Sequence, residues 1–259
     1  MALRRAAAAV QLRPGELDFR RLPRAELERM AAAGREVALC EAVLGKTADT
    51  VVGELLRGQP FFEWDHYPAG EVFDPETGAL YYYHAHPQSE RDPREHGHFH
   101  AFLKSPEPSV EIRPLPVPAS DLRAGHDGFA HLIAIAMDAE SHPVRLFTTN
   151  RWVTGESWHR AKDVLALSHR FAVGHARPSW PANRWITAML ALFRPQLVWL
   201  LEERDRALAA WAKGHSGEDA TEDRRFEILS SLPIEVAGQR RAIDAALAET
   251  ARPRPPARS

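Results

Sequence analysis

Residues 80–104 read LYYYHAHPQSERDPREHGHFHAFLK, and the expected fold is built outward from this stretch. Two runs of aromatic, apolar and histidine residues, 80–86 and 96–104, flank a charged segment with two prolines, 87–95. Aromatic-rich runs bounded by turn-forming residues are typical of β-strands. The stretch therefore predicts two antiparallel strands joined by an exposed loop.

Histidine occupies every second position in both predicted strands. Five of the thirteen histidines lie in residues 84–100, where an even spread would put about one. Alternate side chains of a strand share a face, so a register that pairs His84 with His98 and Tyr82 with His100 would gather all five imidazoles. A shift of one residue would separate the two sets.

A divalent metal would explain such a cluster. Clustered imidazoles repel one another when protonated, and they lack partners when they are buried and neutral. A metal ion takes neutral imidazole nitrogen directly, with zinc or iron expected and copper or nickel as alternatives. A hydrogen-bonded layer of histidine and tyrosine without metal is the competing interpretation. The expected ligands are His84, His86, His96, His98 and His100.

Three residues are candidates for catalysis beside that metal. Glu95 adjoins the second histidine run and could act as a base, and His98 lies at its centre. Arg151, in the segment Thr148–Trp152 after an apolar run, could hold a carboxylate or phosphate, although turn formation explains this segment equally well. His66 is a further candidate. His131 is expected at the edge of the core, with the alternative that it reaches the histidine hairpin if its strand lies next to it.

Two known motifs have partial counterparts here. The spacing Gly78-x5-His84-x-His86-x3-Glu90-x6-Gly97 resembles the first cupin motif, which implies a β-helix barrel with His84, His86 and Glu90 as metal ligands. No second cupin motif follows. The segment His96-x-His98-x-His100 is similar to the histidine-triad nucleotide hydrolases, which implies that His98 attacks a phosphate.

A third resemblance covers most of the chain. The tyrosine-rich strand, the His-x-His pair, the segment 95–100 (EHGHFH) and the segment 148–152 (TTNRW) together look like an uncharacterised bacterial family of unknown function. This resemblance implies no activity.

The rest of the chain predicts helices around this sheet. Helical spacing follows Pro23 to Gly45 and recurs near 48–56, and further apolar strands are expected at 130–137 and 144–149. Helices are expected over about 157–250, including one near 221–230. The prediction is one α+β domain, 23–250, with its antiparallel sheet at about 70–150, an N-terminal arm at 1–22 and a disordered tail at 251–259.

Composition limits the functions to be considered. The net charge of −2 gives no broad basic surface, so no nucleic-acid partner is expected. No apolar run is long enough for a membrane helix, and the single cysteine fits a reducing compartment, so we expect a cytoplasmic protein with a small-molecule ligand. The sequence does not decide whether the protein is an enzyme. If it is one, metal-dependent hydrolysis or oxygenation of a small molecule is the expected class. The alternatives are a non-catalytic metal-binding protein and a histidine-triad-like phosphoester hydrolase.

Overall fold

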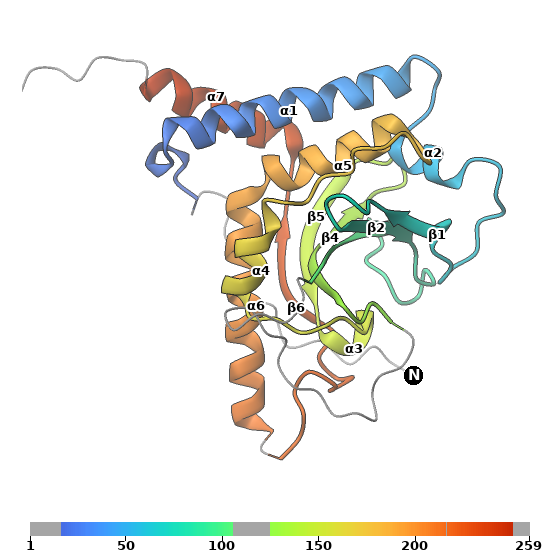
Figure 1. Cartoon of the computed structure of the whole chain (residues 1–259), viewed down its shortest axis with the longest axis vertical. Coiled ribbons are helices and arrows are strands. Elements are labelled where there is room, and N and C mark those ends of the chain that lie inside the picture. The colour runs from blue at the N-terminus through green and yellow to red at the C-terminus, as the bar shows by residue number, and fades with distance from the viewer. Residues whose placement is uncertain (1–16, 106–124, 216, 251–259) are drawn as a thin grey trace, which may run out of the picture.

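The computed structural model describes residues 17–105, 125–215 and 217–250, and it contains a six-stranded antiparallel sheet flanked by helices (Figure 1). The α+β prediction is confirmed. Residues 1–16 of the expected arm and the expected tail at 251–259 lie outside the described residues. The strands are β1 (Tyr67–Phe73), β2 (Ala79–His84), β3 (Gly97–Lys104), β4 (Phe129–Met137), β5 (Pro143–Thr149) and β6 (Ile228–Pro233).

The helices come before the sheet and after β5, as expected from the sequence. Figure 1 shows α1, α5 and α7 along one end of the molecule and α4 and α6 along one side of the sheet. No helix in the described ranges has the length and apolarity needed to cross a membrane. The helices are η1 (Phe19–Arg21), α1 (Arg24–Gly45), α2 (Val51–Leu56), α3 (Arg151–Thr154), α4 (Ala161–Ser168), α5 (Trp180–Leu192), α6 (Arg194–Gly214) and α7 (Val236–Thr250).

The sheet is a meander in which every strand pairs with its neighbours in sequence, in the order β1 to β6. The predicted register of β2 and β3 is confirmed, with His84 opposite His98 and Tyr82 opposite His100. Because side chains alternate along a strand, this register puts two chemically different sets of residues on the two faces.

One face of the sheet packs against the helices. Tyr81 and Tyr83 of β2 and Phe99 of β3 belong to the same core cluster as residues of α1 and α5. The Tyr81 hydroxyl donates a hydrogen bond to Asn183 Oδ1 on α5, which satisfies the one polar atom of this buried ring. The opposite face carries Tyr82 and the alternate histidines, so the fold leaves that face for the site.

Two predicted helices differ from the structure. The helix expected over 157–171 is only α4, and part of the helix expected near 221–230 is strand β6. β6 completes the sheet because Ser230 lies opposite Thr148 of β5, with their hydroxyl oxygens 2.6 Å apart. The Ser230 hydroxyl also donates to the carbonyl of Leu200 on α6. These tertiary partners override the local helical pattern.

Candidate metal centre

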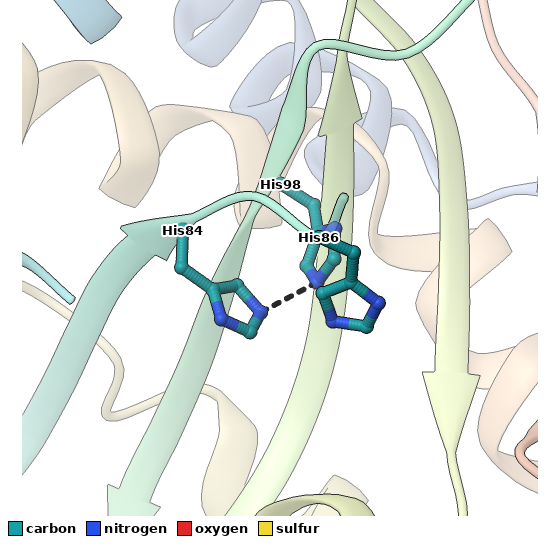
Figure 2. Close-up of side chains that lie close together, drawn as sticks. All are labelled: His84, His86 and His98. Carbon is teal, nitrogen blue, oxygen red and sulfur yellow. Dashed lines mark hydrogen bonds between the residues drawn. The ribbon is translucent and has the colours of Figure 1, made fainter. Parts of the chain in front are cut away.

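Three imidazoles meet where β2 ends and β3 begins. His84 is the last residue of β2, His98 is the second residue of β3, and His86 lies in the connecting loop beside them (Figure 2). One nitrogen from each of the three rings lies within 4.8 Å of the others. The Nε2 atoms of His84 and His98 are 2.7 Å apart, so in this arrangement one ring donates a hydrogen bond to the other.

The donor set of these three residues suits a divalent metal ion. Two nitrogens that bind one zinc at about 2.0–2.1 Å and the tetrahedral angle lie about 3.3 Å apart, so the His84 and His98 rings need only a small separation to share an ion. Among the described residues, His84 Nδ1 is buried and has no hydrogen-bond partner. This nitrogen could therefore bind a ligand, because no group of the described chain contacts it with a hydrogen bond.

Burial keeps these imidazoles neutral. Burial, with a smaller contribution from His86 and His66, lowers the pKa of His84 to about 3. Burial also holds the pKa of His98 well below its usual range and lowers that of His86. Neutral imidazole is the form that binds metal, so these rings need not lose protons near neutral pH before they bind an ion.

His100 and His131 extend the cluster along β3 and β4. The His100 ring centre lies 4.8 Å from that of His98, and its Nδ1 is 3.0 Å from His131 Nε2. His131 reaches this face because the β3–β4 register shifts between the pairs Ala101–Ile133 and Phe102–His131. This irregularity reverses the alternation that the sequence suggests, so His131 contacts the cluster although we expected it at the core edge.

His96 is separated from the other four predicted ligands. Its Nδ1 lies 2.6 Å from the hydroxyl of Tyr83, whose side chain belongs to the helix-covered face. The prediction that all five imidazoles share one face is therefore wrong for His96. The reason is that β3 begins only at Gly97, so strand alternation does not extend to residue 96.

Glu71, His66 and His126 form a second group of titratable side chains, which the sequence does not reveal. The Glu71 carboxylate lies between two imidazoles, 2.7 Å from His66 Nδ1 and 3.0 Å from His126 Nε2. Glu71 has a positive φ of 61° next to a shift in the β1–β2 register. A positive φ is uncommon for residues other than glycine, and such conformations often occur at functional sites. Only His66 was a candidate from sequence, because nothing local connects residues 66, 71 and 126.

The hydrogen bonds of His126 indicate that its ring is doubly protonated. Its Nδ1 is 3.1 Å from the carbonyl oxygen of Thr154, and its Nε2 is 3.0 Å from Glu71. Both partners only accept, so both ring nitrogens donate. Burial disfavours the charge, but the hydrogen bond to Glu71 outweighs this and raises the pKa of His126. Burial likewise opposes ionisation of Glu71, yet the bonds from His126 and His66 lower the pKa of Glu71 to about 2.

Two adjoining open cavities border the three clustered histidines. The larger, of about 580 Å³, is lined by His84, and the smaller, of about 290 Å³, is lined by His98. His86 and His100 line both, as do Glu90 and Glu227. The imidazoles are therefore reachable by a small molecule from either cavity.

The two predicted catalytic residues outside the histidine cluster are engaged in ion pairs. Glu95 lines the smaller cavity and accepts two hydrogen bonds from Arg145, of 2.6 Å and 2.9 Å. Arg151 is buried, pairs with Glu222 and lines neither of these cavities. The structure thus brings Glu95, but not Arg151, to the cleft beside the histidines.

The open meander sheet differs from the β-helix barrel that the cupin resemblance implies, and Glu90 lies outside the group of three imidazoles.

Comparison with known proteins gives this chain a family but no activity. Neither the curated proteins nor the solved structures give a match. A family model described as a domain of unknown function (DUF6969) matches residues 31–234, which include every strand and all the histidines of the cluster. The chain therefore belongs to this family.

Proposed function

We propose that this chain is a metal-dependent enzyme that acts on a small molecule, with His84, His86 and His98 as the protein ligands of a zinc or iron ion. The observation that carries the proposal is a group of three imidazoles beside an open cavity of about 580 Å³. An ion held by three protein nitrogens keeps an open position at which it would activate water or dioxygen.

The surrounding residues support a catalytic centre over a storage or purely structural one. A structural metal site closes its shell with four protein ligands, whereas these three imidazoles border two cavities. His100 lies beside them with its Nδ1 held by His131, so its remaining nitrogen is available to a ligand in the cleft. We assign Glu95 the role of fixing Arg145 at the wall of the smaller cavity, because both its oxygens accept from that guanidinium.

Metal analysis tests the ligand set. Protein purified without a histidine tag is expected to contain about one equivalent of metal, and the His84→Ala/His98→Ala double variant is expected to lose it. The matched control is His142→Ala/His169→Ala, which removes two exposed imidazoles. Zinc would favour hydrolysis and iron would favour oxygenation. The proposal fails if native protein stays metal-free after incubation with zinc, iron, copper and nickel salts.

Cobalt substitution tests the open position separately. Cobalt(II) bound by three histidines and an exchangeable water should change its visible spectrum when azide is added. An unchanged spectrum would mean a closed shell, which would support the non-catalytic alternative.

A further inference from the structure

Two carboxylates face the larger cavity without a cation. Glu90 and Glu227 line both cavities, and within the described ranges neither side chain has a hydrogen bond or an ion pair. Burial and the nearby negative charge of Glu90 raise the pKa of Glu227, against an opposing effect of Arg145 across the smaller cavity. Glu90 is exposed and Glu227 is partly buried, so both carboxylates are accessible to a cation that enters the cavity.

The smaller cavity shows how the chain itself satisfies such a carboxylate. Arg145 pairs with both oxygens of Glu95, and its guanidinium carbon lies 4.4 Å from the ring centre of Phe147. A cation is thus held between a carboxylate and an aromatic face. The larger cavity is also lined by carboxylates and aromatic rings. The imidazolium of His126 lines it too, but this cation is already paired with Glu71.

Aromatic side chains complete the larger cavity. Trp64 is 53% exposed and stacks on His86 with ring centres 4.3 Å apart, while Trp152 and Tyr82 also line the wall. Trp64 adopts a φ of 73°, an uncommon conformation for a bulky residue, and its backbone N–H donates to the Ala85 carbonyl. The fold therefore holds an exposed indole at the mouth of the cavity.

A buried polar group also lines this cavity. The His100 side chain belongs to a residue only 1% exposed, its Nδ1 is engaged by His131, and no partner for its Nε2 is found in the described part of the chain. This nitrogen offers a ligand a hydrogen-bonding atom, independent of the two carboxylates.

We propose that the larger cavity binds a small organic ammonium ion, held by Glu90 and Glu227 and covered by the indole of Trp64. The inference rests on the proposed function only in that the ammonium compound would be the substrate of the metal centre. Binding of the cation itself needs no metal, so the two proposals can be tested apart.

Calorimetry on chelator-treated full-length protein provides the test. The probes are choline and its neutral isostere 3,3-dimethylbutan-1-ol. We expect choline to bind at least about tenfold more tightly than the alcohol. Glu90→Gln/Glu227→Gln and Trp64→Leu should each weaken choline binding by about tenfold or more, whereas the exposed Glu140→Gln control should bind like the wild type.

The outcomes separate the two proposals. Equal affinity for choline and the alcohol, or full choline binding by the Glu90→Gln/Glu227→Gln variant, would overturn the ammonium site. Since Trp64 is exposed, the Trp64→Leu variant tests the cavity wall without disturbing the core. Retention of choline binding by a protein that never takes up metal would support the ammonium site and remove the metal centre.

Discussion

At the scale of single residues, Gly97 has no room for a side chain. A Cβ atom at this position would lie 2.5 Å from the His84 carbonyl oxygen and 2.5 Å from the Tyr83 hydroxyl. The first contact is with backbone, which cannot rotate away. Glycine therefore lets β2 and β3 approach closely where His84 and His98 come together.

Gly97→Ala is expected to destabilise the protein by about 2–3 kcal/mol, because the added methyl group forces the two strands apart. Urea unfolding would measure the loss. Gly214→Ala is the matched control, since a Cβ there meets nothing within 4 Å. Equal stability of the two variants would show that the contact at Gly97 relaxes without cost.

Glu71 controls the protonation of His126. Replacing its carboxylate in Glu71→Gln removes the charge that raises the pKa of His126, and burial then remains to lower it. We expect the pKa of His126 to fall below its value in the wild type, as followed by NMR titration of the imidazole protons. The exposed Glu76→Gln substitution should leave it unchanged. A constant pKa in Glu71→Gln would mean that the Thr154 carbonyl alone holds the imidazolium.

At the scale of strands, the sequence predicts the pairing of β2 with β3 well, because both strands repeat the same two-residue pattern. Tyr82 and His84 alternate with Tyr81 and Tyr83, and a shift of one residue in the register would separate the histidines of the two strands. The pattern ends where regular strand geometry ends. His96 precedes β3, and His131 follows a shift in the β3–β4 register, so alternation assigns both to the wrong face.

Contacts between distant segments could not be predicted from local patterns. The β6 strand forms next to β5, about eighty residues earlier in the chain, and Ser230 bonds to both β5 and α6. The Glu71 pair with His126 depends on a left-handed residue in β1. Neither feature has a periodicity or spacing that a single sequence would reveal.

The histidine-bearing strands should make the metal-free protein sensitive to acid. The pKa of His84 and of His131 is lowered to about 3, chiefly by burial, and those of His98 and His100 lie well below 6.5. Below pH 6.5 the unfolded chain therefore binds more protons than the folded chain. The contribution of these histidines to the free energy of unfolding is largest above pH 6.5 and is lost as the pH falls toward 3. Glu156 acts in the opposite direction, since burial raises its pKa to about 7.

Four histidines outweigh one carboxyl group, so the net effect of these five groups is destabilisation on acidification, about 4 kcal/mol per pH unit where the effect is steepest. Unfolding free energies measured from pH 7.5 to 5 without metal should decrease accordingly. His84→Gln/His98→Gln should show a shallower decrease, because two of the titrating groups are gone. A pH dependence identical to that of the wild type would show that these two imidazoles do not control it.

At the scale of the whole molecule, the division of the sheet into two faces links the candidate site to the stability of the fold. Tyr81, Tyr83 and Phe99 anchor β2 and β3 to the helices, while the neighbouring residues His84 and His98 meet on the other face. The site therefore exists only when both strands are correctly paired and packed. A ligand that binds this native arrangement, and not the unfolded chain, must stabilise the entire domain.

Zinc is accordingly expected to raise the melting temperature of the metal-free protein. At a free concentration about 100 times its dissociation constant, a ligand specific for the native state adds about 2.7 kcal/mol, which corresponds to about 5–10 °C for a chain of this size. Differential scanning fluorimetry with and without zinc would measure the shift. His142→Ala/His169→Ala should respond like the wild type, and His84→Ala/His98→Ala should not respond. A shift of equal size in the His84→Ala/His98→Ala variant would place the stabilising zinc elsewhere, because this variant lacks the two imidazoles that meet where β2 ends and β3 begins.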